Sequence, residues 1–181
     1  MISIDSPSTK RKQTLILFGK RFTLSPFKRQ YGTSFKIRSI RPDTILISIM
    51  FANNEIGTIE PIKEIGEIAK KHDIFFNTDA VQAFGHIAIN VDEMHIDMLS
   101  ASGHKFHGPK GIGFFYMRDT VKIGPLIHGG AQERSRRAGT HNVPGIVGIA
   151  TAAKSAYEDL DQENRMYMQI RLNRRFLSDR A

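Results

Sequence analysis

Lys105 has the most direct potential for covalent chemistry in this sequence. It lies between an apolar, strand-like stretch at 97–101 and a Gly-Pro-Lys-Gly turn that leads into another at 111–117. A lysine in such surroundings can be partly desolvated, and the neutral amine that results is a nucleophile able to form a Schiff base with a carbonyl compound. The alternative, an ordinary solvated surface lysine, stays open at this point.

Asp79 and Gln82 form a second group with possible ligand chemistry. Asp79 follows the apolar stretch 74–77, and Gln82 comes three residues later. A fixed carboxylate can pair with a protonated ring nitrogen, which the pyridine ring of pyridoxal 5'-phosphate needs in order to accept electron density. The Gln82 amide can donate to the phenolate oxygen of the same ring. The structural alternatives are a helix N-cap for Asp79 and a polar loop position for Gln82.

Ser102 and His104 flank Gly103 and offer donors for a phosphate group. A tight turn that exposes N–H groups beside a hydroxyl is a common anion site. His104 can equally be a structural histidine. We expect no metal site, because the three-residue spacing of His104 and His107 lacks carboxylate or thiolate support.

The elements that must position these residues alternate along the chain. Apolar stretches at 44–51, 74–77, 97–101 and 111–117 are typical of strands, and the first of them is typical of a buried parallel strand. In open α/β sheets the loops at the carboxyl ends of the strands form the ligand crevice. Asn54 follows the first strand, so we expect Asn54, Asp79 and Lys105 to meet at one edge.

Two helical patterns complete the expected fold. After Pro61, a residue tolerated at the first helical position, apolar residues repeat at helical spacing to about Lys71. A second helical stretch opens at Asn142 and continues in segments towards Phe176. The alternation predicts an α/β domain with a mainly parallel sheet and flanking helices.

Composition excludes several classes of function. The 181 residues include no cysteine, so this chain offers no disulfide, thiolate metal site or cysteine nucleophile. No apolar run is long enough to span a membrane, so we expect a cytoplasmic protein with no membrane partner.

Residues 1–40 carry nine lysines and arginines and one aspartate, which accounts for the whole net charge of +8. Those residues suit a basic arm that touches phosphates, a targeting peptide or a segment with no role in the fold, and the neutral body argues against nucleic acid as a partner.

Four segments resemble the cysteine desulfurases of the class V aminotransferase, fold-type I pyridoxal-phosphate group. The segments follow one another in the family's order and match from about Ile40 onward. They are FANNEIG at 51–57, TDAVQAFG at 78–85, SGHKFHGPKG at 102–111 and GGAQERSRRAGT at 129–140.

The resemblance implies a role for each matching residue. Lys105 would form the Schiff base with pyridoxal 5'-phosphate, Asp79 would pair with the pyridine nitrogen, and Gln82 would contact the phenolate oxygen. The other implied contacts are the cofactor phosphate for Ser102 and His104, the cofactor or substrate for Asn54, and the phosphate of a neighbouring subunit's cofactor for Thr140. The last contact implies a homodimer.

The implied reaction converts L-cysteine to L-alanine and passes the sulfur, through an enzyme persulfide, to an acceptor protein for iron–sulfur cluster or thionucleotide assembly. Three alternatives stay open. They are a selenocysteine lyase, another class V aminotransferase-type enzyme, and a non-catalytic remnant whose basic arm binds nucleic acid or a partner.

The departures from the family pattern predict a fragment. Residues 1–39 do not resemble the family and are expected to be a basic, poorly ordered leader. Residues 40–160 would be part of the cofactor-binding large domain, and 161–181 a helical extension towards a missing small domain. Since that small domain supplies the catalytic cysteine loop, we expect the fragment to be inactive alone.

Overall fold

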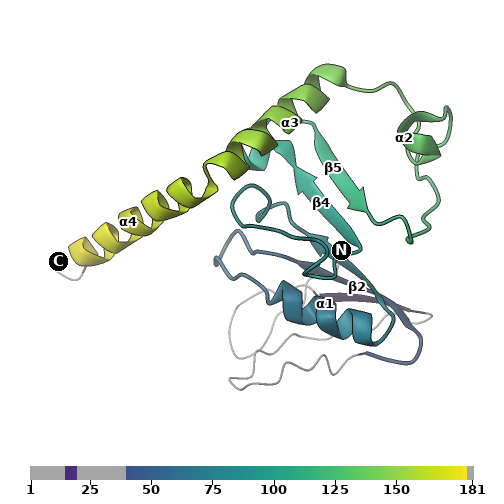
Figure 1. Ribbon diagram of the computed structural model, residues 1–181, viewed down its shortest axis with the longest axis horizontal. Helices are drawn as coiled ribbons and strands as arrows, with labels where there is room; N and C mark the ends of the chain where they lie inside the picture. Colours follow the sequence, from purple (N-terminus) through teal and green to yellow (C-terminus); the bar gives the residue numbers. More distant parts are fainter. Residues whose placement is uncertain (1–14, 20–39, 179–181) are drawn as a thin grey trace.

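A five-stranded sheet forms the body of the computed structural model, which describes residues 15–19 and 40–178, with side chains from 40 to 170. The strands lie in sequence order across the sheet (Figure 1). They are β1 (Leu15–Gly19), β2 (Thr44–Met50), β3 (Phe75–Asp79), β4 (Met98–Ser102) and β5 (Gly113–Met117). Much of the expected leader, 1–14 and 20–39, lies outside the described residues, but 15–19 form an edge strand.

The sheet is mixed, with a parallel centre and antiparallel flanks. β2, β3 and β4 are parallel neighbours, whereas β1 and β5 pair antiparallel with β2 and β4. The expected α/β class is therefore confirmed, and the parallel character is confined to the three central strands. β5 reverses because only ten residues separate it from β4, fewer than the dozen or so that a parallel crossover needs.

One face of the sheet holds the core. Ile47, Ile49, Phe76 and Leu99 are buried on this face, where Ile65 of helix α1 (Ile62–Lys71) joins them. β2 alternates buried and partly exposed residues, so within the described chain only one of its faces is covered, rather than both as the continuous apolar run suggested. The opposite face carries both polar and apolar side chains, among them the buried Met98; on it the Asn77 amide donates to the Ser48 hydroxyl at 2.8 Å.

Helix α1 connects β2 to β3, as its sequence pattern predicted. Its buried residues Ile62, Ile65, Gly66 and Ala69 recur at helical spacing and face the sheet. Pro61 is the N-cap residue, one position before the helix, and not the first helical residue as expected.

The C-terminal part is helical. Helix α3 (Val143–Glu158) begins after Asn142, whose side-chain oxygen accepts a hydrogen bond from the Gly145 amide at 3.1 Å. Helix α4 (Leu160–Ser178) then leads away from the sheet (Figure 1). The predicted helical stretch is thus confirmed, with a break at Asp159. Within the described chain, no helix combines the length and the apolar character that crossing a membrane would require.

Candidate functional site

The carboxyl ends of the three parallel strands are tied together by backbone hydrogen bonds. Asp79 is the last residue of β3, and its register partners are Met50 at the end of β2 and Ser100 in β4. The Phe51 amide donates to the Asp79 carbonyl at 2.8 Å, and the Ala80 amide donates to the Ser100 carbonyl at 2.9 Å. The segments after β2, β3 and β4 therefore start from one edge, as the sequence predicted.

One of the two oxygens of the Asp79 carboxylate is hydrogen bonded within the fold. Its Oδ1 accepts a hydrogen bond from the Val81 amide at 3.0 Å, so this oxygen caps a turn, and no helix follows as the N-cap alternative required. Among the described residues, none donates to the second oxygen. A side chain fixed through Oδ1 presents Oδ2 in a set direction, which is what a carboxylate needs in order to receive a proton-bearing ring nitrogen.

Lys105 is carried by a short turn that directly follows β4. This 3₁₀ turn, η1 (Gly103–Lys105), is closed by the Gly108 amide, which donates to the Gly103 carbonyl at 2.8 Å. A Cβ on residue 108 would lie 2.9 Å from that carbonyl oxygen, so the close approach requires glycine. The Gly103 amide donates to the Ile112 carbonyl at 2.9 Å, which corrects our expectation that this N–H is offered to a phosphate. Ser102, which is partly exposed, and His104, which is exposed, remain as side-chain donors.

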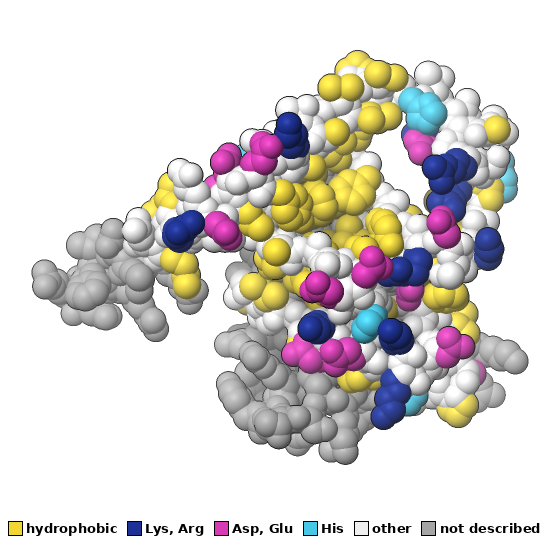
Figure 2. All heavy atoms as spheres, viewed as in Figure 1, with side chains coloured by type: hydrophobic (Ala, Val, Ile, Leu, Met, Phe, Trp, Pro, Cys, Tyr) yellow, Lys and Arg dark blue, Asp and Glu magenta, His cyan; other side chains and the backbone are white. Residues whose placement is uncertain are grey.

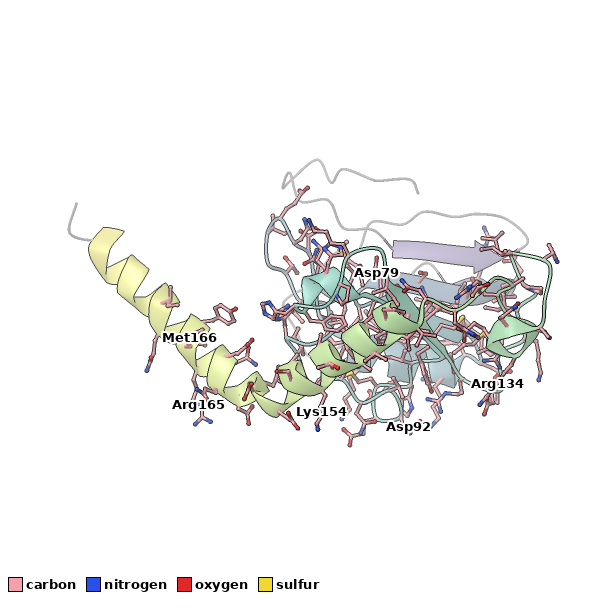
Figure 3. The ribbon with its side chains drawn as sticks, turned by 90° about the horizontal axis from the view of Figure 1, so that it is seen from above. Asp79, Asp92, Arg134, Lys154, Arg165 and Met166 are labelled. Carbon is pink, nitrogen blue, oxygen red and sulfur yellow. The ribbon has the colours of Figure 1, made fainter. Side chains whose placement is uncertain are left out.

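The turn between β3 and β4 brings Gln82 to the same region. The Ala83 and Phe84 amides both donate to the Ala80 carbonyl, which closes a turn. Gln82 lies within this turn and is partly exposed. His86, at the end of the same turn, hydrogen bonds to the Lys105 carbonyl at 2.9 Å. The segments that carry Asp79 and Lys105 are thus in direct contact. Figure 3 shows Asp79 within the body of the domain and Met166 on the projecting helix.

Asn54 lies in an exposed loop built by a residue that the sequence analysis did not single out. The Asn53 side-chain oxygen accepts hydrogen bonds from the amides of Glu55 at 2.8 Å and Ile56 at 3.1 Å. The signal was available, since an asparagine followed four residues later by a glycine, Gly57, is typical of such a turn. The loop therefore starts from the Asp79 edge, with Asn54 exposed on it.

Thr140 lies in the segment that precedes helix α3. It is exposed and follows helix α2 (Gln132–Ser135), where Glu133, Arg134 and Ser135 have positive φ angles. No hydrogen bond or ion pair seen in the described chain joins 132–141 to the turns that carry Asp79 and Lys105. Figure 2 shows basic side chains, in dark blue, on the surface around α2.

The opposite, amino-terminal ends of β3 and β4 hold an ion-pair network that sequence reasoning missed. The Arg118 guanidinium contacts Asp92 at 2.8 Å and Asp97 at 3.5 Å and also donates to two backbone carbonyls. The hydrogen bond to Asp92 raises the pKa of Arg118. Because Asp97 also accepts from the Phe76 amide at 2.8 Å, the network joins the strand ends and its role is structural.

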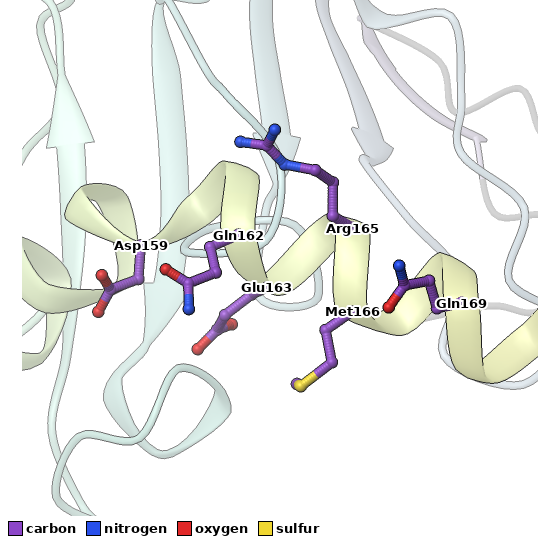
Figure 4. Close-up of a pocket in the computed structure, with 6 residues that line it drawn as sticks. All are labelled: Asp159, Gln162, Glu163, Arg165, Met166 and Gln169. Atoms are coloured by element: carbon purple, nitrogen blue, oxygen red, sulfur yellow. The ribbon is translucent and has the colours of Figure 1, made fainter.

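A shallow hollow on α4 lies apart from the strand-end site. Residues from the α3–α4 junction and the first turns of α4 form it, as Figure 4 shows. Its lining residues are Asp159, Gln162, Glu163, Arg165, Met166 and Gln169. The hollow contains none of the residues expected to hold a cofactor.

Comparison with known proteins finds relatives that match most of this chain. The "Cysteine desulfurase IscS" of Methanosarcina thermophila is 64% identical over 133 residues, and that of Dictyoglomus turgidum is 58% identical over 134 residues. These matches cover 74% of this chain but only 33% and 34% of the relatives, so the chain spans about a third of their length.

Solved structures give the same result. The structure titled "SspA in complex with cysteine" superposes with a TM-score of 0.63 at 54% identity, over 64% of this chain and 34% of that one. A "NIFS-LIKE PROTEIN" superposes with a TM-score of 0.66 at 50% identity, over 68% and 34%. The family described as aminotransferase class-V matches residues 28–178, a range that begins inside the leader expected at 1–39. This chain therefore belongs to the aminotransferase class-V family.

Proposed function

We propose that this chain is the cofactor-binding part of a pyridoxal-phosphate-dependent cysteine desulfurase, which takes sulfur from L-cysteine and leaves L-alanine. The observation that carries the proposal is the junction of β3 and β4. There Asp79 ends β3 with one carboxylate oxygen bound to the Val81 amide, and Lys105 lies on the turn that follows the neighbouring parallel strand β4. The segments after the two strands are in contact through His86. The similarity to a protein solved with cysteine supports this choice of substrate.

The residues present fit the cofactor by their chemistry. Pyridoxal phosphate, when bound, supplies an electron-accepting ring. The free oxygen of Asp79 would hold the proton of the ring nitrogen, and the Gln82 amide would donate to the phenolate oxygen. Ser102 and His104 would bind the phosphate, and Asn54 would contact cofactor or substrate. Lys105 would hold the cofactor covalently through Nζ, its amine condensing with the aldehyde as one water leaves.

Two further parts of the proposal concern the intact protein. Thr140 would reach the cofactor phosphate of a second subunit in a homodimer, a role supported by its exposure. A separate acceptor protein would receive the sulfur for iron–sulfur cluster or thionucleotide assembly.

The test uses the purified 181-residue chain and pyridoxal phosphate. We expect an absorption band near ~400 nm, typical of this cofactor bound to an amine. We also expect borohydride reduction to fix the label on the peptide that contains Lys105. Lys105→Ala should abolish both signals, whereas Lys110→Ala, at an exposed lysine of the same loop, should keep them. Equal labelling of Lys105→Ala and the unmodified chain would overturn the proposal.

A second experiment separates cofactor binding from turnover. Because the chain contains no cysteine, sulfur from L-cysteine has no cysteine thiol on this polypeptide to receive it. We expect the cofactor-loaded chain to bind L-cysteine and to produce neither protein-bound persulfide nor alanine. Alanine production by the chain alone would contradict the expected inactivity.

A further inference from the structure

The turn between β3 and β4 holds the main chain of Lys105 through a histidine ring. His86 Nε2 lies 2.9 Å from the Lys105 carbonyl oxygen. A carbonyl oxygen only accepts hydrogen bonds, so Nε2 must carry the hydrogen and donate it. The contact links residues nineteen positions apart in the sequence, one on each of the two turns that form the proposed site.

The Lys105 carbonyl needs such a partner because its own turn is short. η1 contains three residues, and the Gly103 carbonyl already accepts from the amides of Phe106 and Gly108. The last carbonyls of a helical turn have no partner within the turn and must find one elsewhere. His86 supplies it for Lys105, and the contact fixes the peptide plane that follows the lysine.

The turn that carries His86 is anchored independently of that ring. Phe84 packs edge-on against Phe106, Phe114 and Tyr157, with ring centroids 5.0, 4.8 and 5.2 Å apart. The Tyr157 hydroxyl donates to the Ile87 carbonyl at 3.4 Å. His86 is therefore presented from a packed support, and loss of its imidazole leaves that support in place.

We propose that His86 is a positioning residue for Lys105: its ring N–H holds the lysine's carbonyl, and thereby directs the Cα–Cβ bond and the amine towards the Asp79 edge. This inference rests on the proposed function, because it assumes that Lys105 is the reacting amine. His86 touches the main chain of Lys105 and none of the reacting atoms, so it acts through the lysine. A flexible lysine reacts faster when its backbone is held in one orientation.

The test compares three variants of the full chain by the rate at which pyridoxal phosphate attaches to Lys105. His86→Phe keeps a ring but removes the donor, and we expect attachment to slow about three- to tenfold, the factor equivalent to one net hydrogen bond. His86→Gln restores a donor of similar reach and should recover most of the rate. Tyr157→Phe removes a different hydrogen bond to this turn, the one to the Ile87 carbonyl, without touching Lys105, and should change the rate less than twofold.

A measurement without cofactor tests the contact directly. The Phe106 amide nitrogen shares a peptide bond with the Lys105 carbonyl, so its ¹⁵N chemical shift reports the hydrogen bond that this carbonyl accepts. We expect the shift to change in His86→Phe and to return towards the original value in His86→Gln. If His86→Phe does not fold, the protonation of Nε2 in the unmodified chain, read from the ring ¹⁵N shifts, decides whether the donor exists.

The outcomes distinguish failure of the positioning role of His86 from failure of the proposed function. If the unmodified chain forms no adduct at Lys105, the proposed function fails and this inference fails with it. If it forms the adduct and His86→Phe reacts at the same rate, the proposed function stands and the positioning role of His86 is overturned. A purely structural role would lower the stability of His86→Phe and His86→Gln alike and give no recovery of rate in the second.

Discussion

Replacing Gly85 by alanine should destabilise the turn on which the proposed site depends. Gly85 has a φ of +81°, in the left-handed region that side chains disfavour. A Cβ at this position would lie 2.6 Å from the Phe106 Cβ and 3.3 Å from the Ala156 Cβ. Phe106 is fully buried and directly follows Lys105, so it cannot move aside without disturbing the lysine's turn.

The expected loss has two parts. A non-glycine residue in the left-handed region costs about 1–2 kcal/mol, and forcing an extra methyl into a packed site costs about 1–3 kcal/mol. The free energy of unfolding should therefore fall by about 2–5 kcal/mol, a large fraction of a typical domain's stability.

Alanine substitutions at two other glycines measure the backbone cost and the steric cost separately. Gly111 has a φ of +76° with open space around its Cβ position, so Gly111→Ala carries the backbone cost alone. Gly124 has open space and no left-handed φ, so Gly124→Ala should be close to neutral. Urea unfolding followed by circular dichroism measures all three variants. A Gly85→Ala loss no larger than that of Gly111→Ala would refute the steric argument and the packing that supports it.

Three further predictions concern stability. Phe106→Ala should lower the free energy of unfolding by about 3–5 kcal/mol, because it empties a fully buried site; a loss under 1 kcal/mol in urea unfolding would contradict the packing. Asn142→Ala should cost about 1 kcal/mol through loss of the α3 cap, and Asn142→Asp, which keeps an acceptor, should cost less. Burial raises the pKa of Tyr157 above its ordinary 10.0. Because the unfolded chain ionises first, stability should fall as the pH rises above that value. Tyr157→Phe should reduce the decline, and an equally steep profile in that variant would contradict this cause.

The elements and the chemistry of the strand ends could be predicted from the sequence. Apolar stretches of strand length alternate with one helical pattern, so the boundaries of β2, α1, β3 and β4 were found within two residues. Asp79 and Lys105 follow strands that the alternation makes parallel, and the carboxyl ends of parallel strands share an edge. The motifs around these residues also led to the family, which the comparisons confirm.

Strand direction and long-range contacts could not be predicted in the same way. A period of two residues records which side chains face the core and carries no information on strand direction, so the signal in the sequence for the antiparallel pairing of β5 is the short connection that precedes it. The hydrogen bond between His86 and the Lys105 carbonyl joins a side chain to a main-chain atom far away in the sequence. Because every residue has a main-chain carbonyl, the type of residue 105 does not indicate that its carbonyl accepts this bond. Local sequence determined the elements and the reactive groups, whereas their orientation depended on packing between segments far apart in the chain, which only the tertiary structure decides.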